Sequence, residues 1–261
     1  MEWLTNDVFQ NILYFVFAFT VLMFFVLSFL DAPYGKHDGD DRSKLWGPNI
    51  PLRLSWILLE APVFFAFAIF FFLGENWLHI TPIILFFMWE IHYFHRTFVY
   101  PFTLKAKPGA GFRVGILATG IPLNALNGFL NGWYISQYGE HLWTTEWLYD
   151  PRFIIGVLTF IGGFALTKQS DDILANLRKP GETGYKIPYG GGFNLVSNPH
   201  YLGELLQWVG FAIACWSLPA LAFVCITLSN LLPKAFSNHR WYHEKFNDYP
   251  KERKSLIPYI I

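Results

Sequence analysis

Long apolar runs dominate this chain and limit it to folds that a lipid bilayer can hold. Of its 261 residues, 53% are hydrophobic and only 15% are charged, which excludes an ordinary soluble domain. A helix needs about 20 apolar residues to cross the hydrocarbon layer. Seven runs are long enough, or nearly so: Val8–Leu30, Leu52–Leu73, Pro82–Phe102, Phe112–Ile135, Phe153–Thr167, Tyr201–Trp216 and Leu218–Phe236. We therefore predict an all-α integral membrane protein with seven transmembrane helices, folded as a single domain over residues 1–261.

The positions of lysine and arginine predict which way these helices run. If all seven runs cross the membrane, 17 of the 19 lysines and arginines fall on one side. Arg152 falls on the other side, and Arg96 lies within a span. Basic residues gather on the cytoplasmic side of membrane proteins. We therefore predict that the N-terminus is outside and the C-terminus is cytoplasmic, and that an anionic ligand would arrive from the cytoplasm.

Polar side chains interrupt the second and third runs. Tyr93, Arg96 and Tyr100 are spaced i, i+3 and i+7, so they share one face of a helix. Glu60 is the only acid of the second run. Ionisable groups at membrane depth are costly, and they usually face the bundle interior and mark a functional site. We therefore expect other helices to give this face polar partners, and a neutral Glu60 can be a hydrogen-bond donor there.

Two other chemistries have to be weighed from the motifs. The pairs His92-x-x-His95 and His239-x-x-x-His243 suggest a di-iron site, but such sites need several more clustered ligands, so we expect no metal. The chain has no Gly-x-Gly-x-x-Gly motif for a Rossmann domain. The stretch Asn198–Glu204 is similar to a motif of isoprenylcysteine carboxyl methyltransferase-type membrane enzymes and to one of sterol reductases. Taken alone, this stretch leaves both readings open.

Eight blocks of sequence occur in the order that is found in one family of membrane reductases. They are Tyr34-Gly-Lys-His37, Glu60-x-Pro62, His92–Tyr100, Leu177–Glu182, Ile187-Pro188 followed by Gly190-Gly191, Gly203-Glu204, Trp216–Phe223 and Asp248–Pro258. Together they resemble the steroid 5α-reductase (3-oxo-5α-steroid 4-dehydrogenase) family, and closely its animal type 2 members. The similarity covers nearly the whole chain, and the block His92–Tyr100 is long and specific.

The resemblance implies a reductase that uses NADPH to convert 3-oxo-4-ene steroids into 5α-3-oxo steroids. Glu60 and Tyr93 match the pair that holds the steroid 3-oxo group, which makes them the catalytic candidates. The cofactor-binding candidates are Lys36, Tyr100, Lys107, Asp171, Arg178, Tyr185, Lys186, His200, Glu204, Asn238, His239, Tyr242 and Arg253. Lys107 and Lys186 stand where the animal enzyme has arginine, and lysine lacks the bidentate fork, so these phosphate contacts are expected to differ.

The chemistry of enone reduction fits the two catalytic candidates. Hydride addition to the β-carbon of an enone moves electron density onto the carbonyl oxygen, which then needs hydrogen-bond donors. The Tyr93 hydroxyl and a neutral Glu60 can each donate one bond, and NADPH would supply the hydride. Glu90 and His92 in the third run have no assigned role.

We expect a steroid or steroid-like lipid as substrate and membrane lipids as further partners. The zero net charge indicates no nucleic-acid partner, and the sequence indicates no obligate protein partner. The expected location is the inner membrane of a bacterium or the endoplasmic reticulum membrane of a eukaryote, with the cofactor site facing the cytoplasm. The alternatives are a methyltransferase that uses S-adenosylmethionine, a reductase of a non-steroid lipid enone, and a lipid-binding protein without enzymatic activity.

Overall fold

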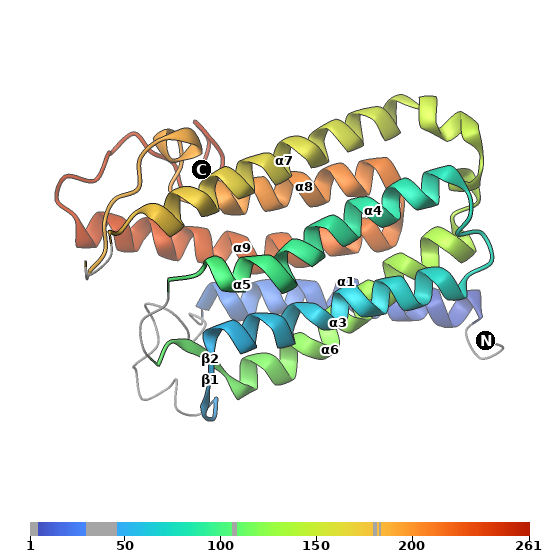
Figure 1. Ribbon diagram of the computed structural model, residues 1–261, viewed down its shortest axis with the longest axis horizontal. Helices are drawn as coiled ribbons and strands as arrows, with labels where there is room; N and C mark the ends of the chain where they lie inside the picture. The colour runs from blue at the N-terminus through green and yellow to red at the C-terminus, as the bar shows by residue number, and fades with distance from the viewer. Residues whose placement is uncertain (1–4, 30–45, 106–108, 180–181, 183) are drawn as a thin grey trace.

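The computed structural model describes residues 5–29, 46–105, 109–179, 182 and 184–261. Two of the predicted cofactor contacts, Lys36 and Lys107, lie outside the described residues. The long helices run roughly along one axis and form an elongated bundle (Figure 1). The start of α1 and the last residues of the chain lie at opposite ends of this bundle.

Each of the predicted apolar runs contains a helix. The bundle helices are α1 (Asn6–Phe29), α3 (Leu52–Leu73), α4 (Ile80–Phe94), α6 (Val114–Trp133), α7 (Pro151–Asn176), α8 (Pro199–Cys215) and α9 (Leu218–Lys245). Within the described part of the chain, α1, α3, α7 and α9 are long and apolar enough to cross a membrane, judged by length and composition. The protein is therefore mostly helical, and several of its helices are suited to span a membrane.

A two-stranded sheet departs from the predicted all-α fold. Strand β1 (Asn49–Pro51) pairs antiparallel with β2 (Gly111–Arg113), and Ile50 lies opposite Phe112. The Ser55 hydroxyl donates to the Ile50 carbonyl (2.9 Å) and accepts from the Phe112 amide (3.3 Å). The sheet joins the residues just before α3 to those just before α6, so it fixes the relative height of these two helices.

The opposite end of the bundle is closed by short helical turns that connect α6 to α7. These turns are η3 (Tyr134–Tyr138), η4 (Glu140–Trp143) and η5 (Thr145–Tyr149). Asp150 begins α7 by accepting a bond from the Arg152 amide (2.8 Å), and it also pairs with the Arg152 guanidinium. These hydrogen bonds lower the pKa of Asp150 from its ordinary value to about 2. The guanidinium also lies over the rings of Trp147 (4.4 Å) and Trp216 (4.9 Å), which ties this connection to the end of α8.

Glycines let two pairs of helices approach until their backbones touch. Gly163 of α7 faces Gly203 of α8, and a Cβ atom on either one would meet the backbone of the other helix. Gly156, seven residues before Gly163, and Gly210, seven residues after Gly203, repeat this arrangement. In the same way, a Cβ atom on Gly128 or Gly132 of α6 would meet the α3 backbone. Small residues that allow such close contact are typical of helix packing in membranes.

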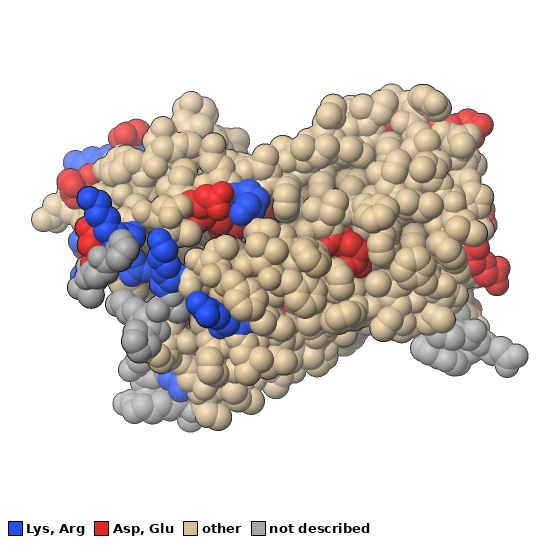
Figure 2. All heavy atoms as spheres, viewed as in Figure 1, with Lys and Arg blue, Asp and Glu red and all other residues tan. Residues whose placement is uncertain are grey.

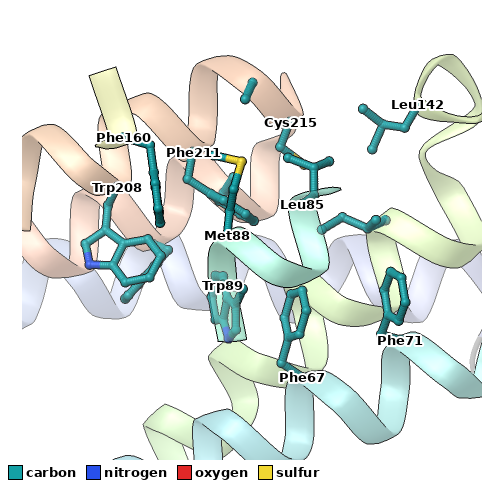
Figure 3. Packing of buried hydrophobic residues seen from close by; sticks show 14 of the residues in the cluster. Phe67, Phe71, Leu85, Met88, Trp89, Leu142, Phe160, Trp208, Phe211 and Cys215 are labelled. Carbon is teal, nitrogen blue, oxygen red and sulfur yellow. The ribbon is translucent and has the colours of Figure 1, made fainter. Parts of the chain in front are cut away.

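An aromatic core joins α3, α4, α8 and α9 (Figure 3). Trp89 of α4 stacks on Phe67 of α3 with ring centroids 4.6 Å apart. On its other side, Trp89 lies 5.2 Å from the ring of Trp208 and 5.2 Å from that of Phe211, both on α8. Because Trp89 and Trp208 are almost wholly buried, this core holds α4 in a fixed position against its neighbours.

The helices differ from the predicted runs at three places. The third run is not one α-helix, because α4 is followed by the π-helical turn η2 (His95–Val99) and then by α5 (Tyr100–Thr103). The helix α7 runs past Thr167 and ends at Asn176, so Arg178 lies beyond it. The helix α9 runs past Phe236 and continues through Lys245.

Charge is distributed unevenly along the bundle (Figure 2). On the face shown, lysine and arginine gather at the end that carries the sheet and the C-terminal half of α9, where acidic side chains also lie, and the opposite end shows acidic side chains only. The surface between the two ends is mostly uncharged, apart from one mixed patch and one acidic patch. This pattern agrees with the predicted asymmetry of basic residues between the two sides of the membrane.

The glycine contacts predict a sharp difference between two adjacent positions on α7. In Gly163→Val the new side chain would meet the α8 backbone, whereas nothing lies within 4 Å of a Cβ atom at Gly162. Overpacking of a close contact costs about 1–3 kcal/mol or more. We expect Gly163→Val to lower the thermal unfolding temperature in detergent by several degrees, and Gly162→Val to change it little. Equal temperatures for the two variants would contradict the close backbone contact between α7 and α8.

Candidate functional site

Five charged side chains converge in the interior of the bundle, each from a different element. Glu60 comes from α3, Arg96 from η2, Asp171 from α7, Glu204 from α8 and Lys234 from α9. Arg96 interacts electrostatically with all three acids, and Lys234 interacts with Glu60 and Glu204. We call these five residues the inner cluster. The structure thus gives the polar face of the third run acidic partners from three other helices, α3, α7 and α8.

The π-helical turn sets the position of Arg96. Its guanidinium lies over the ring of Trp56 (4.6 Å) and over that of Tyr100 (4.5 Å), and these two rings are themselves in edge contact (5.3 Å). The Tyr100 amide donates to the His95 carbonyl, one residue further back than in an α-helix. Such single π-turns are frequent at functional sites. Trp56 was not among the predicted site residues, because an aromatic residue near the start of an apolar run gives no functional signal.

Tyr93 lies beside the inner cluster and is only 4% exposed. Its ring stacks on Trp208 with the centroids 5.5 Å apart and contacts Trp89 at 5.2 Å. It interacts electrostatically with Glu60, Glu204 and Arg96. The two catalytic candidates therefore belong to one buried site, and the stacked tryptophan rings fix the orientation of the Tyr93 ring.

A hydrogen bond behind Tyr93 was not predicted. Gln207 of α8 donates from its amide nitrogen to the Nδ1 atom of His92 (2.7 Å), and both residues are fully or almost fully buried. The His92 ring also contacts the edge of Trp208, at 4.6 Å between centroids. The sequence did contain one sign that Gln207 faces the site. It lies on the same face of α8 as Glu204 and Trp208, because the three residues are spaced i, i+3 and i+4.

A second cluster lies at the basic end of the bundle, around the C-terminal tail. Arg253 is 3% exposed and donates to the Pro188 carbonyl (3.0 Å). Its guanidinium lies over the rings of Tyr189 (4.7 Å) and Tyr249 (5.3 Å). Tyr242 of α9 stacks on Tyr249 with the centroids 5.1 Å apart. Two of the cofactor-binding candidates, Tyr242 and Arg253, are thus held by the same ring.

Asn198 connects this second cluster to the start of α8. Its amide nitrogen donates to the Ala235 and Ser255 carbonyls (3.1 and 3.0 Å). Its amide oxygen accepts from Asn238 (3.0 Å). Asn198 therefore does not cap α8 with its side chain, and the helix begins with Pro199, whose missing N–H suits the first helical turn.

The preceding residue, Ser197, links two more members of the second cluster. Its hydroxyl bonds to the Nδ1 atom of His239 (2.6 Å) and to the Tyr249 hydroxyl (2.7 Å). Asn238, His239, Tyr242 and Arg253 therefore gather around residues 197 and 198. Six residues further on, Glu204 belongs to the inner cluster, so the first two turns of α8 run from one cluster to the other.

Three other cofactor-binding candidates make longer or more exposed contacts. Arg178 bonds to the Gly184 carbonyl at 3.4 Å, and Tyr185 is 46% exposed with its ring 4.7 Å from that of Trp241. Lys186 pairs with Glu182 (2.5 Å) on the surface, and this bond, with one from the Lys179 amide, lowers the pKa of Glu182. Such exposed pairs are weak and can open to admit another anion.

Several buried polar atoms of the two clusters have no hydrogen-bond partner among the residues that the structure describes. They are Oδ2 of Asp171, Nδ1 of His200 and Nε of Arg253. Leaving a buried polar atom without a hydrogen bond costs free energy, so each of these atoms is a candidate contact for a polar ligand. Among the residues that the structure describes, no three His, Cys, Asp or Glu side chains are grouped to hold a metal ion.

Comparison with known proteins assigns this arrangement to a family. The family model described as 3-oxo-5-alpha-steroid 4-dehydrogenase matches residues 110–261. Steroid 5-alpha-reductase DET2 of Arabidopsis thaliana is 38% identical over 240 residues, which are 90% of each chain. 3-oxo-5-alpha-steroid 4-dehydrogenase 2 of Sus scrofa is 44% identical over 214 residues, or 82% of each chain. With a matching family model and similarity along most of its length to named enzymes, this chain belongs to the family of 3-oxo-5-alpha-steroid 4-dehydrogenases, the steroid 5-alpha-reductases.

Proposed function

We propose that this chain uses NADPH to reduce the 4,5 double bond of 3-oxo-4-ene steroids and that Tyr93 and Glu60 bind the reacting carbonyl. Membership of the family supports steroid reduction in general. The observation that supports the finer assignment is the burial of Tyr93 beside Glu60, inside a bundle whose exterior is apolar. A steroid is apolar and dissolves in the bilayer, so such a site suits its single polar reacting group.

Tyr93 and Glu60 would act together on the oxygen of the enone. When a hydride reaches C5, negative charge develops on the 3-oxo oxygen, and the Tyr93 hydroxyl donates a hydrogen bond to it. Glu60 in its protonated form donates a second bond, and one of the two groups supplies the proton. Arg96 lies close enough to interact with both residues, so its charge also favours the negative oxygen. The surrounding rings exclude water, which strengthens each of these interactions.

The second cluster has the groups that an anionic dinucleotide requires. Arg253 and Arg178 can pair with phosphates, and the rings of Tyr242 and Tyr249 can pack on flat groups. The unpartnered atoms of Asp171, His200 and Arg253 fit a polar ligand that extends from the tail toward the inner cluster. NADPH, when bound, supplies the hydride. The protein would bind NADPH and orient the enone.

The arrangement of the bundle supports separate routes for the two molecules. We propose that all seven helices cross the membrane as one domain, with the N-terminus outside and the basic end of the bundle in the cytoplasm. The gathering of lysine and arginine at that end supports this orientation. NADPH would then enter from the cytoplasm, and the steroid from the bilayer. No obligate protein partner is needed for either step.

The proposed function is tested with purified protein in lipid nanodiscs, NADPH and a set of enones. We expect loss of NADPH absorbance with a 3-oxo-4-ene steroid and none with its 5α-reduced product. If the protein reduced a non-steroid lipid enone but not the steroid, the proposed reaction would stand and the proposed substrate class would be rejected. No NADPH consumption with any enone would reject the proposed reaction.

The variant Tyr93→Phe tests the role of the hydroxyl group. The ring and its stacking on Trp208 are kept, so the protein should fold and bind NADPH as before. Loss of one donor to a developing oxyanion lowers kcat by about 10²–10³-fold. Single-turnover kinetics measure this directly, and a kcat close to that of the wild type would remove Tyr93 from the mechanism.

Glu60 can be tested by comparing two replacements of similar size. Glu60→Gln keeps a hydrogen-bond donor, whereas Glu60→Leu removes it. If Glu60 donates to the enone oxygen, the glutamine variant should retain at least tenfold more activity than the leucine variant. Equal activity in the two variants, with thermal unfolding matched, would contradict a donor role.

Arg253 provides a test of the cofactor site. Arg253→Lys keeps the charge but loses the planar group that packs between Tyr189 and Tyr249. We expect NADPH to bind at least tenfold more weakly, with little change in steroid affinity. Arg240→Lys on the exposed surface of α9 is the matched control. Unchanged NADPH affinity in Arg253→Lys would reject this residue as a contact.

A further inference from the structure

A groove opens on the outside of the bundle between α3 and α4. Its volume is about 320 Å³, and it is lined by Phe64, Ala68, Phe86, Glu90, Ile91 and Phe94. Ligand pockets in proteins begin at about 300 Å³, so this groove is large enough for one compact apolar molecule. Five of the six lining residues are apolar, and the sixth is a carboxylic acid.

Glu90 does not fit the apolar surroundings. It is only 7% exposed, and neither of its carboxyl oxygens has a hydrogen-bond partner among the residues that the structure describes. The other side chains that line the groove carry no polar atom that could provide one. A carboxyl group without a partner at membrane depth is costly, and such residues are usually functional. Both oxygens lie just beneath the groove surface, so a ligand in the groove could bring the missing partner once the Glu90 side chain turns toward it.

The groove faces the lipid. Ile91 and Phe94 on its α4 side are 54% and 53% exposed. Phe65 and Phe87, next to lining residues on α3 and α4, are 51% and 55% exposed. Because large apolar side chains with this exposure contact lipid tails in a membrane protein, a molecule dissolved in the bilayer can reach the groove without crossing water.

The groove also adjoins the proposed catalytic pair. On α4, Glu90 precedes Tyr93 by three residues, and on α3, Phe64 follows Glu60 by four. Residues with this spacing are neighbours on one helix face, so each wall of the groove lies one turn from one member of the pair. Glu90 and Tyr93 interact electrostatically.

We propose that this groove binds a hydroxyl-bearing steroid from the bilayer and that Glu90 is the hydrogen-bond partner of the hydroxyl group. A hydroxyl both donates and accepts, so it satisfies the carboxyl group whether that group is protonated or ionised. A keto group accepts only, and it pairs only with the protonated acid. The inference rests on the proposed function, because it takes the ligand to be the steroid substrate on its way to Tyr93 and Glu60.

The first experiment measures binding alone and needs no turnover. The protein in nanodiscs is labelled, without NADPH, by a photoactivatable 3-oxo-4-ene steroid that has a 17β-hydroxyl group, and the labelled residues are mapped by mass spectrometry. We expect saturable labelling of α3 and α4 around Phe64 and Phe94. Glu90→Leu should weaken the apparent affinity about 3- to 10-fold, the effect of losing one hydrogen bond. Glu90→Gln should restore it, because an amide also donates and accepts.

Two further variants keep the test independent of Glu90. Ala68→Phe fills the groove from α3 and should abolish the labelling there, whereas Ile69→Phe adds a ring on the neighbouring lipid-facing position and should not. Labelling that is absent from α3 and α4 in the wild type, or that survives in Ala68→Phe, would overturn the proposal. So would a Glu90→Leu variant with the affinity of the wild type.

A second experiment compares turnover of the 17β-hydroxy steroid with that of its 17-keto counterpart. In Glu90→Leu we expect the ratio of the two kcat/KM values to shift about 3- to 10-fold toward the keto steroid, with kcat for either one nearly unchanged. An unchanged ratio would count against Glu90 as the hydroxyl partner. If the protein reduced no steroid, the proposed function would fail, and the labelling experiment would still decide whether the groove binds the hydroxysteroid.

Discussion

The electrostatic interaction among the five residues of the inner cluster is the constraint on which the rest of the structure depends. Three acidic and two basic residues lie in a bundle surrounded by apolar side chains, and they come from five separate elements. A charged group is costly to remove from water unless a group of opposite charge lies near it. The helices must therefore converge at one depth. The glycine contacts between α7 and α8 and the π-turn that carries Arg96 are the local features that allow it.

The same convergence explains how one site could serve two very different molecules. The first two turns of α8 connect the second cluster, at the basic end, to the inner cluster in the bundle. An anionic cofactor would meet arginine and tyrosine side chains first, and only its reacting part would need to reach the interior. An apolar substrate would instead meet phenylalanine and isoleucine side chains on α3 and α4. If the proposed function is right, the two approaches would stay apart until both molecules reach Tyr93.

Hydrophobic patterning predicted most of the fold, because in a bilayer the length of an apolar run nearly determines a helix. All predicted runs contain helices. The π-turn at His95–Val99 was missed, because a shift of one hydrogen bond leaves no mark on an apolar pattern. The helices α7 and α9 run past their apolar runs to Asn176 and Lys245, where polar residues with good helix propensity continue them.

The candidate site could be predicted in part. Sequence spacing placed Tyr93, Arg96 and Tyr100 together, and the structure keeps Arg96 against Tyr100. The bond between His92 and Gln207 joins residues 115 positions apart, and no local pattern indicates such a pairing. The same holds for Ser197 with His239 and Tyr249. The catalytic and cofactor roles assigned to these residues remain predictions.

The central claim is that the buried Tyr93 and Glu60 pair orients an enone for hydride addition at C5. It is tested most directly by following a deuterium atom from the reduced nicotinamide ring of NADPH into the steroid product. The account predicts one deuterium at C5, on the α face, and a proton from solvent exchange at C4. Deuterium at the carbonyl carbon, which would yield an alcohol, or a product without deuterium would contradict it.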